Sequence, residues 1–397
     1  MINKFWLIFI SMIPVIISDA AAVQQAEIDG QKDNISLASK DTSDVSTARN
    51  ETILMLAGFG SLGAINSNQT HGDYVLDSFM PNGAGRSTDL DLNNYSKFAV
   101  QASALFSPKV SGQLQVITAY NADGSFQPDV EWYNIKYILN NELAVRVGRV
   151  ELPTFLDSGN HDVGYSYAWA HLPIEMYHLL SIQTSDGIDA TYRSKIGDSS
   201  NSLKLLFGQN TSDRPTSLST SKDMLGIFDK FEYNQIIFNL SLQKRNTSYQ
   251  NKLTGLNSGW YESSDLSVGV NYDPGNWFLI SEWIQSHTRY NSAAMYVSAG
   301  YRINKFTPFI VHGQNNAGSF PAGSTPSISS VARADRSQKT DSVGVRWDFM
   351  KNYDLKFQYD QVTLSDQSNG FLANVPTNVL LYGDTFYAVS AVVDFVF

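Results

Sequence analysis

The feature that most constrains this fold is a long series of segments in which apolar and polar residues alternate one by one. From Thr52 onward, segments of about ten residues recur, divided by Gly, Pro, Asn, Asp and Ser. Asp265 to Tyr272 is one strictly alternating example. Successive side chains of a strand point to opposite faces of a sheet, so each segment predicts a strand with one apolar face. The sequence contains about sixteen such segments.

The connections between these segments also alternate, between short turns and long loops. This pattern is typical of an up-and-down barrel in an outer membrane, whereas a soluble β-sandwich, whose strands also alternate, has no reason to show it. The connection at 286–291 is short although it stands in a long-loop position. The short turns lie at 107–110, 140–141, 273–275, 304–305 and 350–352, and the long loops at 66–94, 151–186, 211–223, 246–261, 314–338 and 365–383.

A sheet in hydrocarbon must close on itself, because every backbone N–H and C=O group needs a partner there. The sequence therefore predicts an all-β fold: a transmembrane antiparallel up-and-down barrel of about sixteen strands over residues 53–397. A barrel of this size encloses a water-filled lumen. A chain with 43% hydrophobic and only 17% charged residues suits an apolar exterior around a wet interior.

The N-terminus has the pattern of an export signal. Lys4 precedes an apolar run from Phe5 to Ile17, and small residues follow at 20–22. We expect a signal peptide over residues 1–22 and a polar periplasmic lead-in over residues 23–52. No later stretch has the roughly 18 uninterrupted apolar residues that a spanning helix needs, so a membrane-embedded chain would cross with strands.

Several functional classes are disfavoured. The net charge of −10 argues against a nucleic-acid partner. A chain without cysteine has no thiolate metal site, and the spacings of His161, His171 and His178 match no compact ligand motif, so we expect neither a metal nor another cofactor. A catalytic barrel is disfavoured because no GxSxG motif or comparable nucleophile context is present.

The C-terminal segment resembles the terminal strand by which Gram-negative outer-membrane barrels are recognised for assembly. Its outward row includes Tyr387, Val393 and Phe395 and ends on Phe397. Residues 342–349 and 353–362 resemble the last hairpin of proteobacterial general porins. This resemblance implies a pore for passive diffusion of small hydrophilic solutes and ions, located in the outer membrane of a Gram-negative bacterium. It also implies contact with lipid and lipopolysaccharide, assembly by the barrel assembly machinery, and a homotrimer.

A second resemblance concerns residues 144–153, which are similar to the fifth strand of such porins. In that family the loop after strand five folds inward and narrows the pore, so the resemblance implies a constriction loop over about 151–186. Its candidate pore residues are Asp157, His161, Asp162, His171, Glu175 and His178.

Alternation places four basic side chains on the lumen wall near this loop: Lys97, Lys136, Arg146 and Arg193. Acids on the loop opposite bases on the wall would create a transverse field that favours polar solutes, which predicts weakly selective diffusion. For Arg149, alternation predicts a lipid-facing position near the outer rim, unless a bulge at Gly148 redirects the side chain.

Two other functions stay open on the sequence. A substrate-specific channel would use a ladder of basic residues for anions or an aromatic track for sugars, and an adhesin or scaffold would act through its long loops. The aromatic track would consist of Tyr165, Tyr167, Trp169 and Tyr177.

Overall fold

The computed structural model describes residues 52–397, apart from 78, 181, 289–290, 317–335, 367, 377, 380 and 382. The predicted signal peptide and residues 23–51 of the predicted lead-in lie outside the described residues. Within the described part of the chain, no helix is both long enough and apolar enough to cross a membrane.

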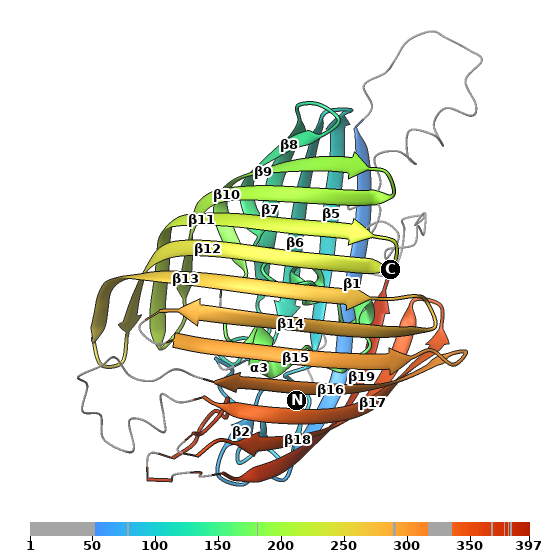
Figure 1. The fold of residues 1–397 in the computed structure, drawn as a ribbon. Helices are drawn as coiled ribbons and strands as arrows, with labels where there is room; N and C mark the ends of the chain where they lie inside the picture. The colour runs from blue at the N-terminus through green and yellow to red at the C-terminus, as the bar shows by residue number, and fades with distance from the viewer. Residues whose placement is uncertain are drawn as a thin grey trace, which may run out of the picture. The chain divides into compact units, whose positions relative to one another are not determined.

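Sixteen long antiparallel strands form one closed barrel, which confirms the predicted fold class (Figure 1). Each strand pairs with its neighbours in sequence, and β1 closes the ring by pairing with both β19 and β5. The strands are β1 (Ile53–Ser67), β5 (Lys97–Ser107), β6 (Val110–Ala119), β7 (Pro128–Ile138), β8 (Leu143–Glu151), β9 (Thr184–Ile196), β10 (Ser199–Asp213), β11 (Ser217–Tyr233), β12 (Ile236–Asn251), β13 (Asn257–Tyr272), β14 (Trp277–His287), β15 (Asn291–Tyr301), β16 (Phe306–Asn316), β17 (Gln338–Met350), β18 (Tyr353–Leu364) and β19 (Thr385–Val396).

Small elements occur in two of the long connections. The connection between β1 and β5 contains β2 (Asp73–Tyr74), β3 (Ala84–Gly85) and β4 (Leu90–Asp91). The connection between β8 and β9 contains the 3-10 turns η1 (Ser158–Asn160) and η2 (Gly164–Ser166) and the one-turn helix α3 (Ile174–Tyr177).

The two faces of the barrel wall have opposite polarity. On β13 the outward Val268 is 44% exposed, whereas the inward neighbours Asp265 and Ser267 are buried. The same arrangement recurs around the ring, with Leu240, Ile310 and Val389 among the exposed apolar side chains. A water-soluble protein normally has the reverse arrangement, so this exterior is suited to a hydrocarbon environment.

Several short turns and a band of aromatic side chains lie at one end of the barrel. Five short turns contain a residue with positive φ, a conformation that Gly and Asn accept more readily than other residues: Gly197, Asn234, Gly275, Asn304 and Asn352. Next to these turns, aromatic rings contact one another across adjacent strands. Examples are Tyr272 with Trp277, Phe306 with Trp347, and Tyr353 with Phe395. Such a band is typical of a membrane interface.

The prediction of two long loops, at 211–223 and 246–261, is wrong. Most of these residues extend strands β10 to β13, which are among the longest strands of the barrel (Figure 1). The loops themselves are short: 214–216 joins β10 to β11, and 252–256 joins β12 to β13. Ser, Thr, Asn and Lys occupy both faces of these extensions, so the apolar alternation that marks a strand in the sequence is missing there. Backbone pairing between neighbouring strands nevertheless continues, with a register shift between Lys222 and Leu225.

Among the described residues, the interior of the barrel contains three hydrophobic clusters, and the long connections supply much of two of them. In one, Tyr74, Ile174 and Phe371 from three different connections pack with β1, β18 and β19. In another, Trp169, Met176 and Tyr177 pack against β14 to β16. Part of the lumen on the β14 to β19 side is therefore filled with packed side chains.

Candidate functional site: the inward loop and the lumen wall

The connection 152–183, here called the inward loop, lies inside the barrel and is hydrogen-bonded to the inner wall. On β14, Glu282 accepts hydrogen bonds from the Leu156 backbone N–H (2.8 Å) and the Tyr177 hydroxyl (3.1 Å). On β15, the Ser298 hydroxyl accepts the indole N–H of Trp169 at 2.7 Å. Barrel residues far away in the sequence therefore determine the path of this loop.

Two basic residues of the wall bind backbone carbonyls of the loop. Lys356 on β18 donates to the carbonyl oxygen of Gly164 at 2.5 Å, and its ammonium lies 4.6 Å from the centre of the Tyr167 ring. Arg346 on β17 donates to the carbonyl oxygens of Tyr165 (2.7 Å) and Tyr167 (3.1 Å). Carbonyls in an irregular loop have no strand partner, so these cations satisfy groups that would otherwise be buried without one.

Two of the predicted constriction residues, Glu175 and His171, are buried between the loop and the wall, and a third, His178, is partly buried. Glu175 is 1% exposed and accepts hydrogen bonds from Gln338 and Thr340 on β17. His171 contacts Asp360 at 3.1 Å. Burial alone would lower the pKa of His171, but the negative charge of Asp360 raises it. Burial lowers the pKa of His178 to about 4.

The other three predicted loop residues, Asp157, His161 and Asp162, are only partly buried. Asp162 forms an ion pair with Lys97 of β5 at 3.3 Å, with about a fifth of each side chain exposed. Burial favours the neutral acid, but the charges of His161 and Lys97 lower the pKa of Asp162. Burial raises the pKa of Asp157 to about 6.

All four predicted wall bases lie on the inner face, in phase with buried neighbours such as Asn134 and Asp189. Arg146 on β8 forms ion pairs with Asp189 (2.6 Å) and Glu151 (3.0 Å). Lys136 lies on β7 and Arg193 on β9, the two strands that flank β8.

The sequence reasoning missed several charged groups of the wall. Lys204 on β10 extends the Arg146 cluster by pairing with Glu151 at 2.9 Å. Lys230 and Glu232 on β11 form a pair at 2.6 Å, with about a third of each side chain exposed. Both lysines alternate with outward apolar residues, so strict period-two counting on β10 and β11 would have identified them.

The accessible charges of the lumen are therefore distributed unevenly. On β14 to β19, the inward side chains of Glu282, Lys356, Asp360 and Asp394 are at most 1% exposed because the long connections cover them, and Arg346 retains 13% exposure. On β5 to β11, the cations Lys97, Arg146, Lys204 and Lys230 retain 14% to 33% exposure, although Asp189, the partner of Arg146, is buried. The loop packs on one half of the wall and leaves charged groups of the other half in contact with water.

The aromatic track considered from the sequence is not available as a solute surface. Tyr167, Trp169 and Tyr177 are all less than 9% exposed, and Tyr165 lies against Arg346, whose guanidinium is 4.6 Å from the ring centre. These rings stabilise the docked loop.

Arg149 faces outward near the long-loop end of β8, where it pairs with Asp186 at 2.8 Å and lies against Tyr133. Gly148 has φ +133°, but the pairing of β8 with both neighbours shows no register shift there. Arg149 therefore lies on the outward face near the rim, and no bulge redirects its side chain.

The C-terminal residues predicted as an assembly signal lie on the outward face of the last strand or directly after it. The Phe395 ring covers Gly60, where an added Cβ would lie 2.4 Å from the ring, and it stacks on Tyr353. Tyr387 stacks on Tyr359, Val393 pairs with Leu62, and Phe397 follows the end of β19.

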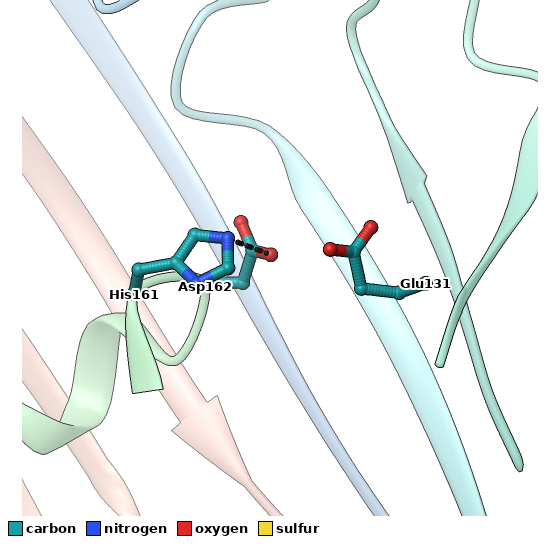
Figure 2. Close-up of side chains that lie close together, drawn as sticks. All are labelled: Glu131, His161 and Asp162. Carbon is teal, nitrogen blue, oxygen red and sulfur yellow. Dashed lines mark ion pairs between the residues drawn. The ribbon is translucent and has the colours of Figure 1, made fainter. Parts of the chain in front are cut away.

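One group of side chains has a composition suited to a metal ion. Potential ligand atoms of Glu131 on β7 and of His161 and Asp162 in the inward loop all lie within 4.8 Å of one another (Figure 2). The histidine spacing in the sequence disfavoured a common metal site of His161, His171 and His178, but it carried no information on a ligand from β7.

No protein-family model and no curated protein sequence matches this chain. Solved structures with the same fold do match. The outer membrane channel DcaP of Acinetobacter baumannii is 13% identical with a TM-score of 0.56, over 89% of this chain and 99% of that one. The anion-selective porin from Comamonas acidovorans is 12% identical with a TM-score of 0.55, over 87% and 100%.

A third similar structure is the trimer form of OmpT, an outer membrane protein of Vibrio cholerae. It is 10% identical with a TM-score of 0.53, over 87% of this chain and 99% of that one. At these identities the likeness establishes the shared barrel fold.

Proposed function

We propose that this chain is a porin of a Gram-negative outer membrane, which passes small hydrophilic solutes and ions through its lumen by diffusion and is not an enzyme. The observation that carries the proposal is the half of the inner wall, β5 to β11, whose charged side chains remain exposed to water beside the inward loop. An apolar exterior around a hydrated, charged interior is what a membrane pore requires.

The arrangement of the charges supports weak selectivity. Basic groups of the wall lie next to acids at several points, such as Arg146 with Glu151 and Lys97 with Asp162, so the described wall carries charges of both signs. A solute that meets several weak sites passes without being held. The porin and channel functions in the names of DcaP and the Comamonas protein agree with this proposal.

The test is the single-channel conductance of the purified protein in a planar bilayer, together with reversal potentials in a salt gradient. We expect large steps that grow with salt concentration without saturation. Absence of conductance would favour a scaffold or adhesin, and current that saturates or is blocked by one solute would favour a substrate-specific channel.

A charge variant links the current to this lumen. Lys230→Glu replaces a half-buried wall cation by an anion and should shift the reversal potential toward cations. Lys109→Glu makes the same change in an exposed turn outside the barrel wall and should leave the reversal potential nearly unchanged. Equal effects of the two variants would contradict conduction past β11.

We further propose that the protein assembles as a homotrimer, in contact with lipid and lipopolysaccharide, after insertion by the barrel assembly machinery. The outward face of β1 and β5 includes small and aliphatic residues that allow close approach of a second copy: Leu54, Leu56, Gly58, Ala64, Ala102 and Ala104. Ala102→Trp should convert trimers to monomers in native mass measurements, whereas Ala299→Trp on the outward face of β15 should not.

A further inference from the structure

The cluster of Glu131, His161 and Asp162 joins the barrel wall to the inward loop. On β7, a register shift opposite Gln115 and Val116 leaves Glu131 without a partner on β6, because Gln115 pairs with Trp132 and Val116 pairs with Val130. Such a bulge redirects a side chain that regular alternation would place elsewhere. Figure 2 shows the Glu131 carboxylate directed at the neighbouring His161 and Asp162 side chains of the loop.

The orientation of the His161 ring directs Nε2 toward the two carboxylates. Nδ1 lies 2.7 Å from the carbonyl oxygen of Ser158, and because a carbonyl only accepts, Nδ1 carries the proton and donates it. Nε2 faces the carboxylates and lies 2.9 Å from Oδ2 of Asp162. A ligating histidine commonly donates its second ring N–H to a backbone carbonyl, which fixes the ring and leaves the other nitrogen for the metal.

Among the described residues, only one of the two carboxylates of the cluster has hydrogen-bond or ion-pair partners. Lys97 contacts Oδ1 of Asp162, while Oδ2 contacts His161. The largely buried Glu131 carboxylate forms neither a hydrogen bond nor an ion pair with any residue that the structure describes. An unpartnered carboxylate directed at a histidine and a second carboxylate favours a bound cation.

We propose that Glu131, His161 and Asp162 bind a divalent transition-metal ion of the Zn²⁺ class, which links the inward loop to β7. One imidazole nitrogen and two carboxylate oxygens form a donor set that Zn²⁺ accepts, with water in the fourth position. The ligand atoms must approach the ion to roughly 2.0–2.2 Å, a small movement from their present separations. Without a metal, Nε2 also carries a proton, which it donates to Asp162. On binding this proton passes to water, and no redox change occurs.

A bound ion would affect solute passage, a consequence that rests on the porin function proposed above. It would neutralise acidic charge where the loop meets β7 and occupy space beside Lys97 in the lumen. Metal binding itself is measurable in the detergent-solubilised protein, so failure of the metal site and failure of the pore are distinguishable.

The test is calorimetric titration of the purified full-length protein with Zn²⁺, and quenching of tryptophan fluorescence by Cu²⁺. Trp132 reports on the site because its ring centre lies 6.1 Å from that of His161. We expect one ion per chain and a saturable quench that disappears in Trp132→Phe. Affinity should fall by about ten-fold or more in His161→Gln and in the isosteric Glu131→Gln.

The matched controls are His312→Gln and His287→Gln, which remove histidines on the outward face of β16 and at the end of β14. Both should bind the ion like the unaltered protein. The proposal is overturned by the absence of binding at millimolar Zn²⁺, by unchanged affinity in both site variants, or by loss of binding in a control. Circular dichroism and heat-dependent gel mobility verify that each variant is folded.

Discussion

Lys356 on β18 and Asp394 on β19 form an ion pair of 2.9 Å in which neither side chain is more than 1% exposed. The same ammonium donates to the carbonyl oxygen of Gly164, so one buried cation connects the last two strands to the inward loop. Three segments that are distant in sequence depend on this contact for their relative position.

The first prediction concerns that cation. Lys356→Met leaves Asp394 buried without its partner, and breaking one side of a buried pair typically costs about 3–5 kcal/mol. We expect a matching decrease in the free energy of unfolding, measured by urea titration in detergent. The double variant Lys356→Met with Asp394→Asn should recover part of the loss, and Lys339→Met on the exposed outer face should change stability by less than about 0.5 kcal/mol.

The second prediction compares two glycines of the inward loop. A Cβ at Gly164 would lie 2.0 Å from a carboxylate oxygen of Asp394, whereas a Cβ at Gly159 would meet nothing within 4 Å. Gly164→Ala should displace the loop, at a cost of about 1–3 kcal/mol, and expose it to limited proteolysis. Gly159→Ala should be cleaved no faster than the unaltered protein, and equal cleavage of the two variants would contradict the docked position of the loop.

The third prediction uses the ion pair between Lys97 and Asp162, which contributes one charge of each sign to the lumen. Lys97→Met should raise the preference for cations, and Asp162→Asn should lower it, because each leaves the opposite charge unbalanced. Reversal potentials of the two variants should therefore move in opposite directions. A shift of the same sign in both would show that ions do not pass this pair.

The fourth prediction is a pH dependence that belongs to Asp157. Burial raises the pKa of this carboxyl to about 6, so it is ionised at pH 7.5 and neutral at pH 5. Acidification over this interval removes one negative charge from the lumen and should reduce the cation preference. The folded protein disfavours the ionised form of Asp157. Its contribution to the free energy of unfolding therefore rises as the pH falls from 6 toward the ordinary pKa of an aspartate.

Asp157→Asn should remove this step from the pH profile of the reversal potential. In Asp162→Asn the step should persist, because the charges of His161 and Lys97 keep the pKa of Asp162 below its ordinary range, and its charge does not change over this interval. A profile unchanged in Asp157→Asn would assign the titration to another group.

The sequence by itself determined the barrel. Period-two alternation is a local property of each strand, and the requirement for one apolar face makes it readable without knowledge of the neighbours. It therefore placed Lys97, Lys136, Arg146 and Arg193 on the inner face. Where both faces of a strand are polar, as in 211–223 and 246–261, this signal is missing. The sequence pattern therefore predicts loops where the structure has strands.

Only the tertiary structure decided where the inward loop packs and which of its side chains remain accessible. Glu175 and Asp162 are both acids of one loop, yet Glu175 is buried on β17 and Asp162 meets Lys97 in the lumen. The proximity of Glu131 to His161 likewise depends on a bulge in β7. These contacts join residues far apart in the chain and depend on the closure of the barrel, which no local pattern encodes.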